Sequence, residues 1–371
     1  MGKGLEDVVA AQTSISDIDG KLGRLFYVGY DIHDLAPSAT FEEIIFLLHN
    51  LRLPTKVELD QLNETLVADR DIVQFIEDLM PTLAHMTSPM SMLRTAVSAM
   101  SAHDPDGWDK SFEASRRKAT RITARVATVL AYYDRIRNGR ELVRPNPKLS
   151  HAANILYMLS GKEPDPESAR VLDMCLVLHA DHTMNASTFT ARVVASTLSD
   201  IHSAVTAAIA ALKGPLHGGA NEAVMKALIE IDDVSRAEEY VKNKFANREK
   251  IMGFGHRVYK TEDPRATHLR VLSKQLGEKT GEPKWYQISR KIEETVMAEK
   301  GLYPNVDFYA ASVYHALGIP TDLFTPIFAA SRVAGWTAHV LEQYADNRII
   351  RPESEYIGPR GRQYVPIEER G

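Results

Sequence analysis

The sequence has 371 residues, of which 44% are hydrophobic and 25% charged, and its 44 Lys and Arg against 49 Asp and Glu give a formal net charge of −5. This composition is that of a globular protein with a sizeable core, and it excludes a mainly disordered chain. The acidic balance argues against a general nucleic-acid or membrane-surface binder, because both need a basic surface, but it permits a local basic pocket for a small anion.

The first structural signal is a small β-hairpin near the N-terminus. The turn residues Asp19 and Gly20 precede residues 24–32, a stretch that contains the β-formers Leu25 and Tyr27. Nothing later in the chain resembles alternating strands and helices, so a parallel sheet is not expected.

Three features of the sequence indicate the cellular compartment of the protein. Residues 1–10 lack a basic segment followed by a long apolar run, so no secretory signal is expected. The longest apolar stretches, such as residues 207–212, are too short to span a bilayer. The single cysteine, Cys175, excludes an intramolecular disulfide and is interpreted as a core residue. We therefore expect a cytoplasmic protein in a reducing compartment.

Helix starts are the commonest signal in the rest of the chain. Thr40 with Glu43 and Thr55 with Glu58 form capping boxes, and residues 235–238 have the same pattern. Two further starts, residues 88–89 and 165–166, pair an N-cap residue with proline at the first helical position.

Additional helices complete a mainly α fold with many helices. A helix stop at Asn138 and Gly139 closes one of them. These helices are predicted over residues 121–137, 199–213, 222–231, 264–276, 285–300, 306–317 and 326–344. Residues 348–371 predict an extended tail, with a disordered terminus as the alternative.

The common nucleotide and metal motifs are absent from the sequence. There is no Gly-x-Gly-x-x-Gly, no Walker loop and no His-Glu-x-x-His. His179 and His182 lie three residues apart on a predicted helix, where they could present two metal ligands on one face. No third ligand is evident nearby, so we favour hydrogen-bonding histidines and expect no metal.

Three segments differ from ordinary scaffold, and the first is the glycine-rich stretch over residues 214–221. It places His217 just before a predicted helix, whose positive end disfavours an imidazolium. His217 is then expected to be neutral and to donate a hydrogen bond. An exposed histidine in a glycine-rich turn is the alternative.

The second segment combines glycines with positive charge. Gly253 and Gly255 let the backbone approach a ligand closely, and His256, Lys260 and Arg265 add donors and charge within ten residues. Such a cluster in an acidic protein predicts an anion pocket, with a solvated basic loop as the alternative.

The third segment, residues 303–309, contains one carboxylate at a helix start. Asn305 is a predicted N-cap, which places Asp307 in the first helical turn, where the carboxylate form is favoured. Asp307 is therefore a candidate base, and a structural charge–dipole role is the alternative.

Together these segments resemble the signature segments of citrate synthases, in order and in spacing. His179-Ala-Asp-His182, Asn185-Ala-Ser187 and residues 331–335 and 347–352 match as well. The resemblance covers nearly the whole chain and is to the short dimeric bacterial type. It implies a two-domain helical fold, with residues 1–217 and 319–371 in a large domain and 218–318 in a small one.

The resemblance also implies a reaction. Citrate synthases condense acetyl-CoA with oxaloacetate and water to citrate and CoA, the entry step of the tricarboxylic acid cycle, with no metal or redox cofactor. Asp307 matches the base that deprotonates the acetyl methyl group, and His217 matches the donor to the enolate oxygen. His256 matches the group that polarises the oxaloacetate carbonyl.

The remaining matches concern binding. His182, Arg265, Arg332 and Arg351 match oxaloacetate ligands, in keeping with the paired donors that two carboxylates require. Lys260 stands where the family often has an arginine that faces the CoA phosphates, and Gly253 and Gly255 are placed with it at the CoA site. The resemblance further implies a homodimer in which Arg351 reaches the partner subunit's site.

Two other functions stay open at this stage. One is a 2-methylcitrate synthase that uses propionyl-CoA, or a relaxed enzyme that uses both acyl groups, because one methylene changes binding in an apolar pocket by only about 1–3 kcal/mol. The other is a His-rich, metal-binding helical scaffold without catalysis, which the joint presence of base, donors and arginines disfavours.

Overall fold

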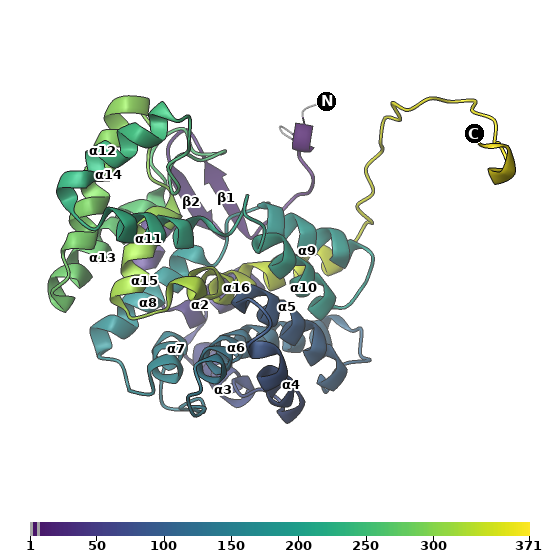
Figure 1. Ribbon diagram of the computed structural model, residues 1–371. Helices are drawn as coiled ribbons and strands as arrows, with labels where there is room; N and C mark the ends of the chain where they lie inside the picture. Colours follow the sequence, from purple (N-terminus) through teal and green to yellow (C-terminus); the bar gives the residue numbers. More distant parts are fainter. Residues whose placement is uncertain (1–2, 6–7) are drawn as a thin grey trace.

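The computed structural model describes residues 3–5 and 8–371. Within them lie sixteen α-helices and one three-stranded sheet, so the expected mainly α fold is confirmed (Figure 1). None of the helices in this part of the chain is long and apolar enough to cross a membrane.

The helices follow one another with few long connections. In chain order they are α1 (Ile32–Ser38), α2 (Phe41–Asn50), α3 (Lys56–Asp69), α4 (Gln74–Ala84), α5 (Pro89–Met100), α6 (Phe112–Arg137), α7 (His151–Ser160), α8 (Pro166–His179), α9 (Ala186–Ser196), α10 (Ile201–Leu212), α11 (Ala220–Ile231), α12 (Val234–Ala246), α13 (Pro264–Thr280), α14 (Lys284–Lys300), α15 (Val306–Ala316) and α16 (Phe324–Ala345).

The N-terminal hairpin is confirmed and gains a third strand. β1 (Ser16–Asp19) pairs antiparallel with β2 (Arg24–Tyr27), and Ser16 faces Tyr27 in the register. β3 (Tyr30–Asp31) adds two more residues on the other side of β2. Leu25 and Tyr27 are fully buried, so one face of β2 packs into the core.

Local capping chemistry sets most helix starts. The Thr40 and Thr55 boxes form as predicted, with each Thr hydroxyl and Glu carboxylate satisfying backbone N–H groups. The predicted box at residues 235–238 is wrong, because the Asp233 carboxylate accepts from the Ser235 N–H and starts α12 two residues earlier, at Val234. α6 also begins earlier than predicted, since the Ser111 hydroxyl caps it at Phe112.

One buried helix forms the centre of the larger group of helices. Nearly the whole of α16 is buried, including Trp336 and Arg332, and it contacts α2, α6, α8, α9 and α10. A second group, α11 to α15, packs mainly against itself, with α15 touching α11, α13 and α14. Figure 1 shows this group at one side of α16. The site described below lies where the two groups meet.

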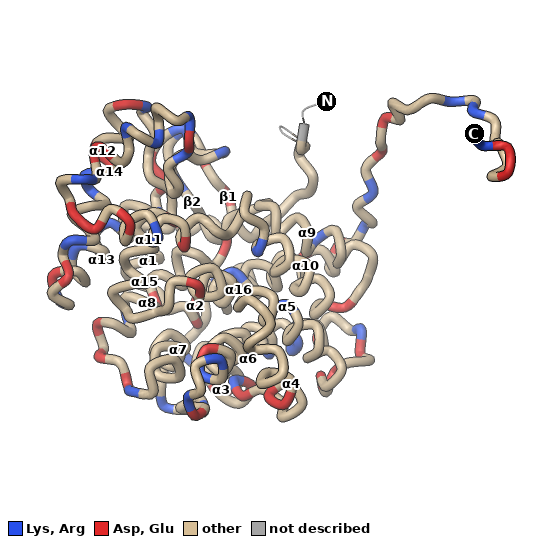
Figure 2. Tube along the Cα trace, viewed as in Figure 1, with Lys and Arg blue, Asp and Glu red and all other residues tan. Residues whose placement is uncertain are grey.

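The C-terminal segment leaves the body of the molecule as the predicted extended tail (Figure 1). Its last anchor is Ser196, whose hydroxyl accepts from the Ile350 N–H at 3.0 Å and whose carbonyl accepts from the Asn347 amide. Residues 351–371 are exposed except for the half-buried Gly358. Acidic and basic residues both occur along this tail and throughout the body (Figure 2).

Candidate active site

The second and third sequence segments lie side by side. The Gly255 N–H donates to the Tyr303 carbonyl at 2.9 Å, and the Asn305 N–H donates to the Gly253 carbonyl at 2.8 Å. Gly253 has φ of +83°, and a Cβ there would lie 2.9 Å from Phe308 atoms, so glycine is required by packing as well as by the backbone. This pairing holds the loop of His256 against the start of α15.

One carboxylate that is not among the predicted site residues fixes two helix starts. Asp263 caps α13 and clamps Arg265 through two hydrogen bonds of 2.9 and 2.7 Å. Its second oxygen also accepts from the Val306 N–H at 3.2 Å, at the start of α15. The Asp-Pro pair, the same helix-start signal as at Asp165, could have identified it. Asp263 thus holds Arg265 and the turn of Asp307 in one arrangement.

Asp307 lies in the first turn of α15, as predicted from its N-cap Asn305. The expected effect of the helix end is outweighed: burial raises the pKa of Asp307 to about 6, while the charges of Arg265 and Arg332 act to lower it. The carboxylate is still mostly ionised at neutral pH, and it is a stronger base than an exposed aspartate.

His256 presents one defined hydrogen-bond donor. Its Nδ1 accepts from the backbone N–H groups of Val258 and Tyr259, at 3.0 and 3.2 Å. Burial, and then the charge of Arg265, lowers its pKa to about 4, so the ring is neutral and its proton is on Nε2. The side chain is therefore built to donate from Nε2 without carrying charge.

His182 is brought to the same place, but not by a helix. α8 ends at His179, so the prediction that the two histidines share a helix face is wrong. His182 is buried, its Nε2 lies 3.2 Å from the Tyr259 hydroxyl, and its ring meets that of His256 edge to face at a centroid distance of 5.1 Å. Across residues 3–5 and 8–371, no group of three His, Cys, Asp or Glu side chains is arranged to hold a metal ion.

His217 is neutral, as expected, but for a different reason. Burial, and then the charge of Arg332, lowers its pKa to about 4. Helix α11 starts only at Ala220, so its dipole is not the main cause. The Ser187 backbone N–H donates to Nε2 at 3.3 Å, and the Ser187 hydroxyl lies 2.9 Å from the same atom. With Nε2 as acceptor, the proton of the neutral ring is on Nδ1.

Arg332 projects into this site from the buried helix α16. Its Nε–H donates to the His179 carbonyl at 2.6 Å, and its guanidinium lies 4.6 Å from the Phe328 ring centroid. Burial lowers its pKa to about 10 and Asp181 opposes the shift, so Arg332 is charged at neutral pH. Arg265 and Arg332 together give two buried cations in an acidic protein, which fits an anionic ligand.

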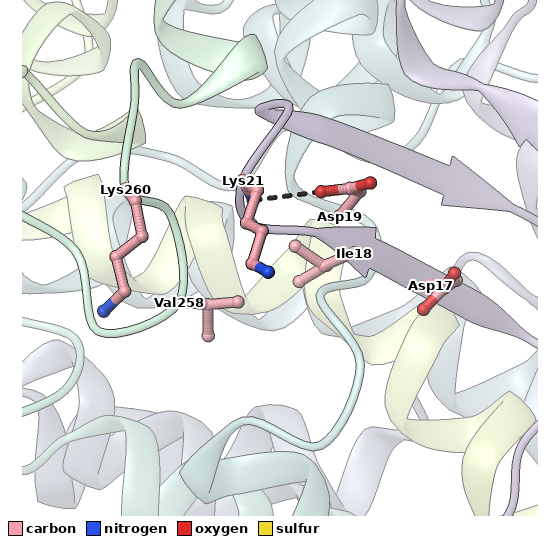
Figure 3. Close-up of a pocket in the computed structure, with 7 residues that line it drawn as sticks. Asp17, Ile18, Asp19, Lys21, Val258 and Lys260 are labelled. Atoms are coloured by element: carbon pink, nitrogen blue, oxygen red, sulfur yellow. Dashed lines mark hydrogen bonds between the residues drawn. The ribbon is translucent and has the colours of Figure 1, made fainter.

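Lys260 lies at the rim, beside the N-terminal hairpin. Its N–H donates to the Gly20 carbonyl at 2.8 Å, and an open hollow of about 460 Å³ extends between Lys260, Lys21 and Val258. Figure 3 shows the Lys21 side chain extending toward Val258, and the Lys260 ammonium on its own loop, where it donates to the Arg257 carbonyl at 3.3 Å. A second hollow, of about 250 Å³, is lined by Lys260, His256 and other residues of the 255–263 and 301–304 loops.

Arg351 is the one predicted site residue that lies apart from the rest. It is exposed, one residue past the last anchor of the C-terminal tail. Within a single chain the fold therefore gathers His182, His217, His256, Arg265, Asp307 and Arg332 around one centre, with Lys260 at its rim, and leaves Arg351 outside.

Comparison with known proteins agrees with the resemblance seen in the sequence. A family model described as citrate synthase, C-terminal domain, matches residues 4–353. The chain is 54% identical over 369 residues to Citrate synthase 2 of Bacillus subtilis, covering 99% of each chain. A relative named 2-methylcitrate synthase 2, from Corynebacterium glutamicum, is more distant, at 41% identity over 99% of this chain and 97% of its own.

Solved structures show the same fold. The citrate synthase of Pyrobaculum aerophilum superposes with a TM-score of 0.93 at 45% identity, over 99% of this chain and 95% of that one. A ternary complex of citrate synthase from Thermoplasma acidophilum with carboxymethyl coenzyme A and oxaloacetate gives a TM-score of 0.94 at 37% identity, over 100% and 99% of the two chains.

Proposed function

The chain belongs to the citrate synthase family, and we propose that Asp307, His217 and His256 carry out its chemistry. The enzyme is an acyltransferase that condenses acetyl-CoA with oxaloacetate and water to citrate and CoA, at the entry to the tricarboxylic acid cycle. The observation that supports the assignment best is the convergence of one buried carboxylate, two neutral imidazoles and two buried arginines at one centre.

In the first step Asp307 removes a proton from the acetyl methyl group. The raised pKa of Asp307, about 6, lies closer to the pKa of the methyl group than that of an exposed aspartate does. Nδ1–H of His217 donates to the thioester oxygen as negative charge develops there. A neutral donor suits this role, because it adds a hydrogen bond in the transition state without attracting the Asp307 carboxylate in the ground state.

The enolate carbon then attacks the ketone of oxaloacetate. Nε2–H of His256 donates to the ketone oxygen and polarises it, and Arg265 and Arg332 with His182 hold the two carboxylates. Arg351 completes this set from the partner subunit, which makes the proposed unit a homodimer. Water then hydrolyses the citryl thioester and releases CoA, and the proposed reaction needs no metal or redox cofactor.

CoA is proposed to lie over the rim. Lys260 faces the CoA phosphates beside the hollow of about 460 Å³, and the backbone of Gly253 and Gly255 lies along the bound CoA. The helices α11 to α15 form the proposed small domain and the remaining elements the large one. We also propose a cytoplasmic location.

Release of free thiol tests the function directly. Purified protein is incubated with oxaloacetate and either acetyl-CoA or propionyl-CoA, and kcat/KM is measured for each. We expect acetyl-CoA to be preferred, because the relatives named citrate synthase are closer than those named 2-methylcitrate synthase. A preference for propionyl-CoA would make the protein a 2-methylcitrate synthase, and no thiol release with either would overturn the assignment.

A further inference from the structure

Two buried polar atoms on neighbouring rings, one of them on the helix of the proposed base, have no hydrogen-bond partner within residues 3–5 and 8–371. They are the Tyr314 hydroxyl and Nε2 of His179, on side chains that are both 0% exposed. The two rings are neighbours, with centroids 6.1 Å apart. Leaving such groups unpaired is costly, so natural proteins nearly always satisfy them.

The two atoms have complementary roles. Nδ1 of His179 lies 2.6 Å from the Cys175 carbonyl, which can only accept, so Nδ1 carries the proton and Nε2 is a bare acceptor. Burial lowers the pKa of His179 to about 3, which keeps the ring neutral. The Tyr314 hydroxyl is a donor that needs an acceptor, since burial, and then the charges of Cys175 and Asp307, raises its pKa and prevents its ionisation.

Tyr314 also lies on the same side of α15 as the base. Asp307 and Tyr314 are seven residues apart, two turns along one helix face. An aromatic side chain on a helix points back toward the N-terminus, so the Tyr314 hydroxyl is directed toward the turn that carries Asp307. The effect of the Asp307 charge on the hydroxyl agrees with this direction.

We propose that Tyr314 is a positioning residue for Asp307, and that its hydroxyl and Nε2 of His179 hold one buried water between them. The water accepts from Tyr314, donates one hydrogen to His179 and donates the other to the Asp307 carboxylate. Each group then has a partner, and the water makes the three hydrogen bonds that buried waters typically make. The inference rests on Asp307 being the base, as proposed above.

This arrangement has a defined consequence for catalysis. A donor to the charged carboxylate favours ionisation, so it limits how far burial can raise the pKa of Asp307. It also fixes the orientation of the carboxylate toward the methyl group. Within residues 3–5 and 8–371 the Tyr314 hydroxyl makes no hydrogen bond to Arg265 or Arg332, so binding of oxaloacetate is not expected to depend on Tyr314.

The test is Tyr314→Phe, which removes one oxygen and preserves the shape. We expect the acid limb of the kcat–pH profile to move up by about 0.5–1 pH unit, the size expected when one hydrogen bond of ordinary strength is lost, because the effect of Tyr314 reaches the carboxylate through the water. At neutral pH kcat should fall about threefold to tenfold, of which the shifted pKa accounts for at most about twofold and the lost orientation of the carboxylate for the rest. KM for oxaloacetate should be unchanged. His179→Asn, whose amide can keep the donor to the Cys175 carbonyl while Nε2 is removed, should move the acid limb in the same direction.

Tyr133→Phe is the matched control. It removes another buried hydroxyl, which donates to the Thr87 carbonyl at 2.7 Å, and it should lower the melting temperature without moving the acid limb. If Tyr314→Phe leaves the acid limb in place, the positioning role is overturned, and a raised melting temperature would then identify the hydroxyl as unpaired. Failure of the base assignment is seen separately, as turnover that survives Asp307→Asn.

Discussion

Burial, more than helix position, sets the protonation state of each reacting group. Desolvation disfavours charge, so it moves the pKa of Asp307 up to about 6 and those of His217 and His256 down to about 4. At neutral pH the result is an ionised base between two uncharged donors. Pairs of groups whose environments move their pKa values in opposite directions are typical of acid–base catalysis.

The first prediction concerns the base. Asp307→Asn keeps the size of the side chain but removes its ability to take a proton, so turnover should fall by more than about 100-fold. Oxaloacetate affinity, measured by calorimetry, should stay within a few-fold of wild type, because the arginines are intact. Asp109→Asn, at an exposed carboxylate, serves as the control. Turnover close to normal in Asp307→Asn would remove this residue from the mechanism.

A second prediction separates the two anion sites. Arg265→Ala and Arg332→Ala each remove charge-assisted hydrogen bonds worth about 1.5–3 kcal/mol, so the KM for oxaloacetate should rise by about 10- to 100-fold, with a much smaller change for acetyl-CoA. Lys260→Ala should show the opposite pattern. Steady-state kinetics with each substrate varied in turn decides the matter, and equal changes in both constants for all three variants would refute the division.

At the scale of elements, the N-terminal hairpin supports the loop of the second segment. Its turn touches that loop through the hydrogen bond between Lys260 and Gly20. A Cβ at Gly20 would lie 2.4 Å from the Val258 carbonyl oxygen, and one at Gly23 would lie 2.7 Å from a Thr261 methyl carbon. The close approach therefore requires glycine at both positions. Through this contact the hairpin supports the loop that carries both His256 and Lys260.

Gly20→Ala should separate these two elements. The added methyl group forces the turn off the loop, at a cost of about 1–3 kcal/mol in folding free energy. We expect the KM for acetyl-CoA to rise, because Lys260 loses its support, and denaturant unfolding should show the lost stability. Lys21→Ala, one residue along the same turn, adds no atom and should leave stability nearly unchanged. Equal stability of Gly20→Ala and wild type would show that the contact is dispensable.

The elements also show which features could be predicted from sequence. Starts set by a local cap, such as Thr40 and Thr55, were predictable because the donor and acceptor lie three residues apart. The start of α12 was missed because two possible caps, Asp233 and Ser235, compete within three residues. The clamp of Asp263 on Arg265 and Val306 joins two helices over 43 residues, so its second half depends on tertiary packing.

At the scale of the whole molecule, the position of Arg351 decides how many chains build one site. It is exposed and follows the last anchor of the C-terminal tail, which leaves the body of the molecule (Figure 1). The family resemblance places it in the partner's site, which predicts an obligate dimer with two shared sites.

Mixed dimers test this prediction. Subunits that carry Arg351→Ala are refolded together with subunits that carry Asp307→Asn, each nearly inactive alone. If Arg351 acts across the interface, a mixed dimer has one site with both residues intact, and substantial activity returns. If it acts within its own chain, every site lacks one group. Verified mixed dimers without activity would therefore assign Arg351 to its own chain.

The last prediction concerns stability in acid. Burial lowers the pKa values of His151 and His179 to about 3, and that of His182 well below its usual 6.5. The unfolded chain therefore binds more protons than the folded one below pH 6.5, and stability falls as pH decreases. Asp173 acts in the opposite direction. Its pKa is raised to about 6 in the folded protein, so its protonation below that pH favours the folded state. Asp307 acts in the same way as Asp173. The three histidines outweigh these two carboxyl groups, so the folded protein loses stability as the pH decreases.

Each such histidine contributes about 1.4 kcal/mol per pH unit between its unfolded and folded pKa values. Urea unfolding at pH 7, 6 and 5, at one protein concentration, should show a steady loss of stability. His151→Gln is a suitable variant, since the ring of His151 packs on Phe41, remote from the catalytic groups, and its Nε2 has no partner within residues 3–5 and 8–371. Its loss of stability per pH unit should be smaller than that of wild type by about 1.4 kcal/mol. The same slope in both proteins would show that His151 is protonated in the folded state, and that burial does not keep it neutral.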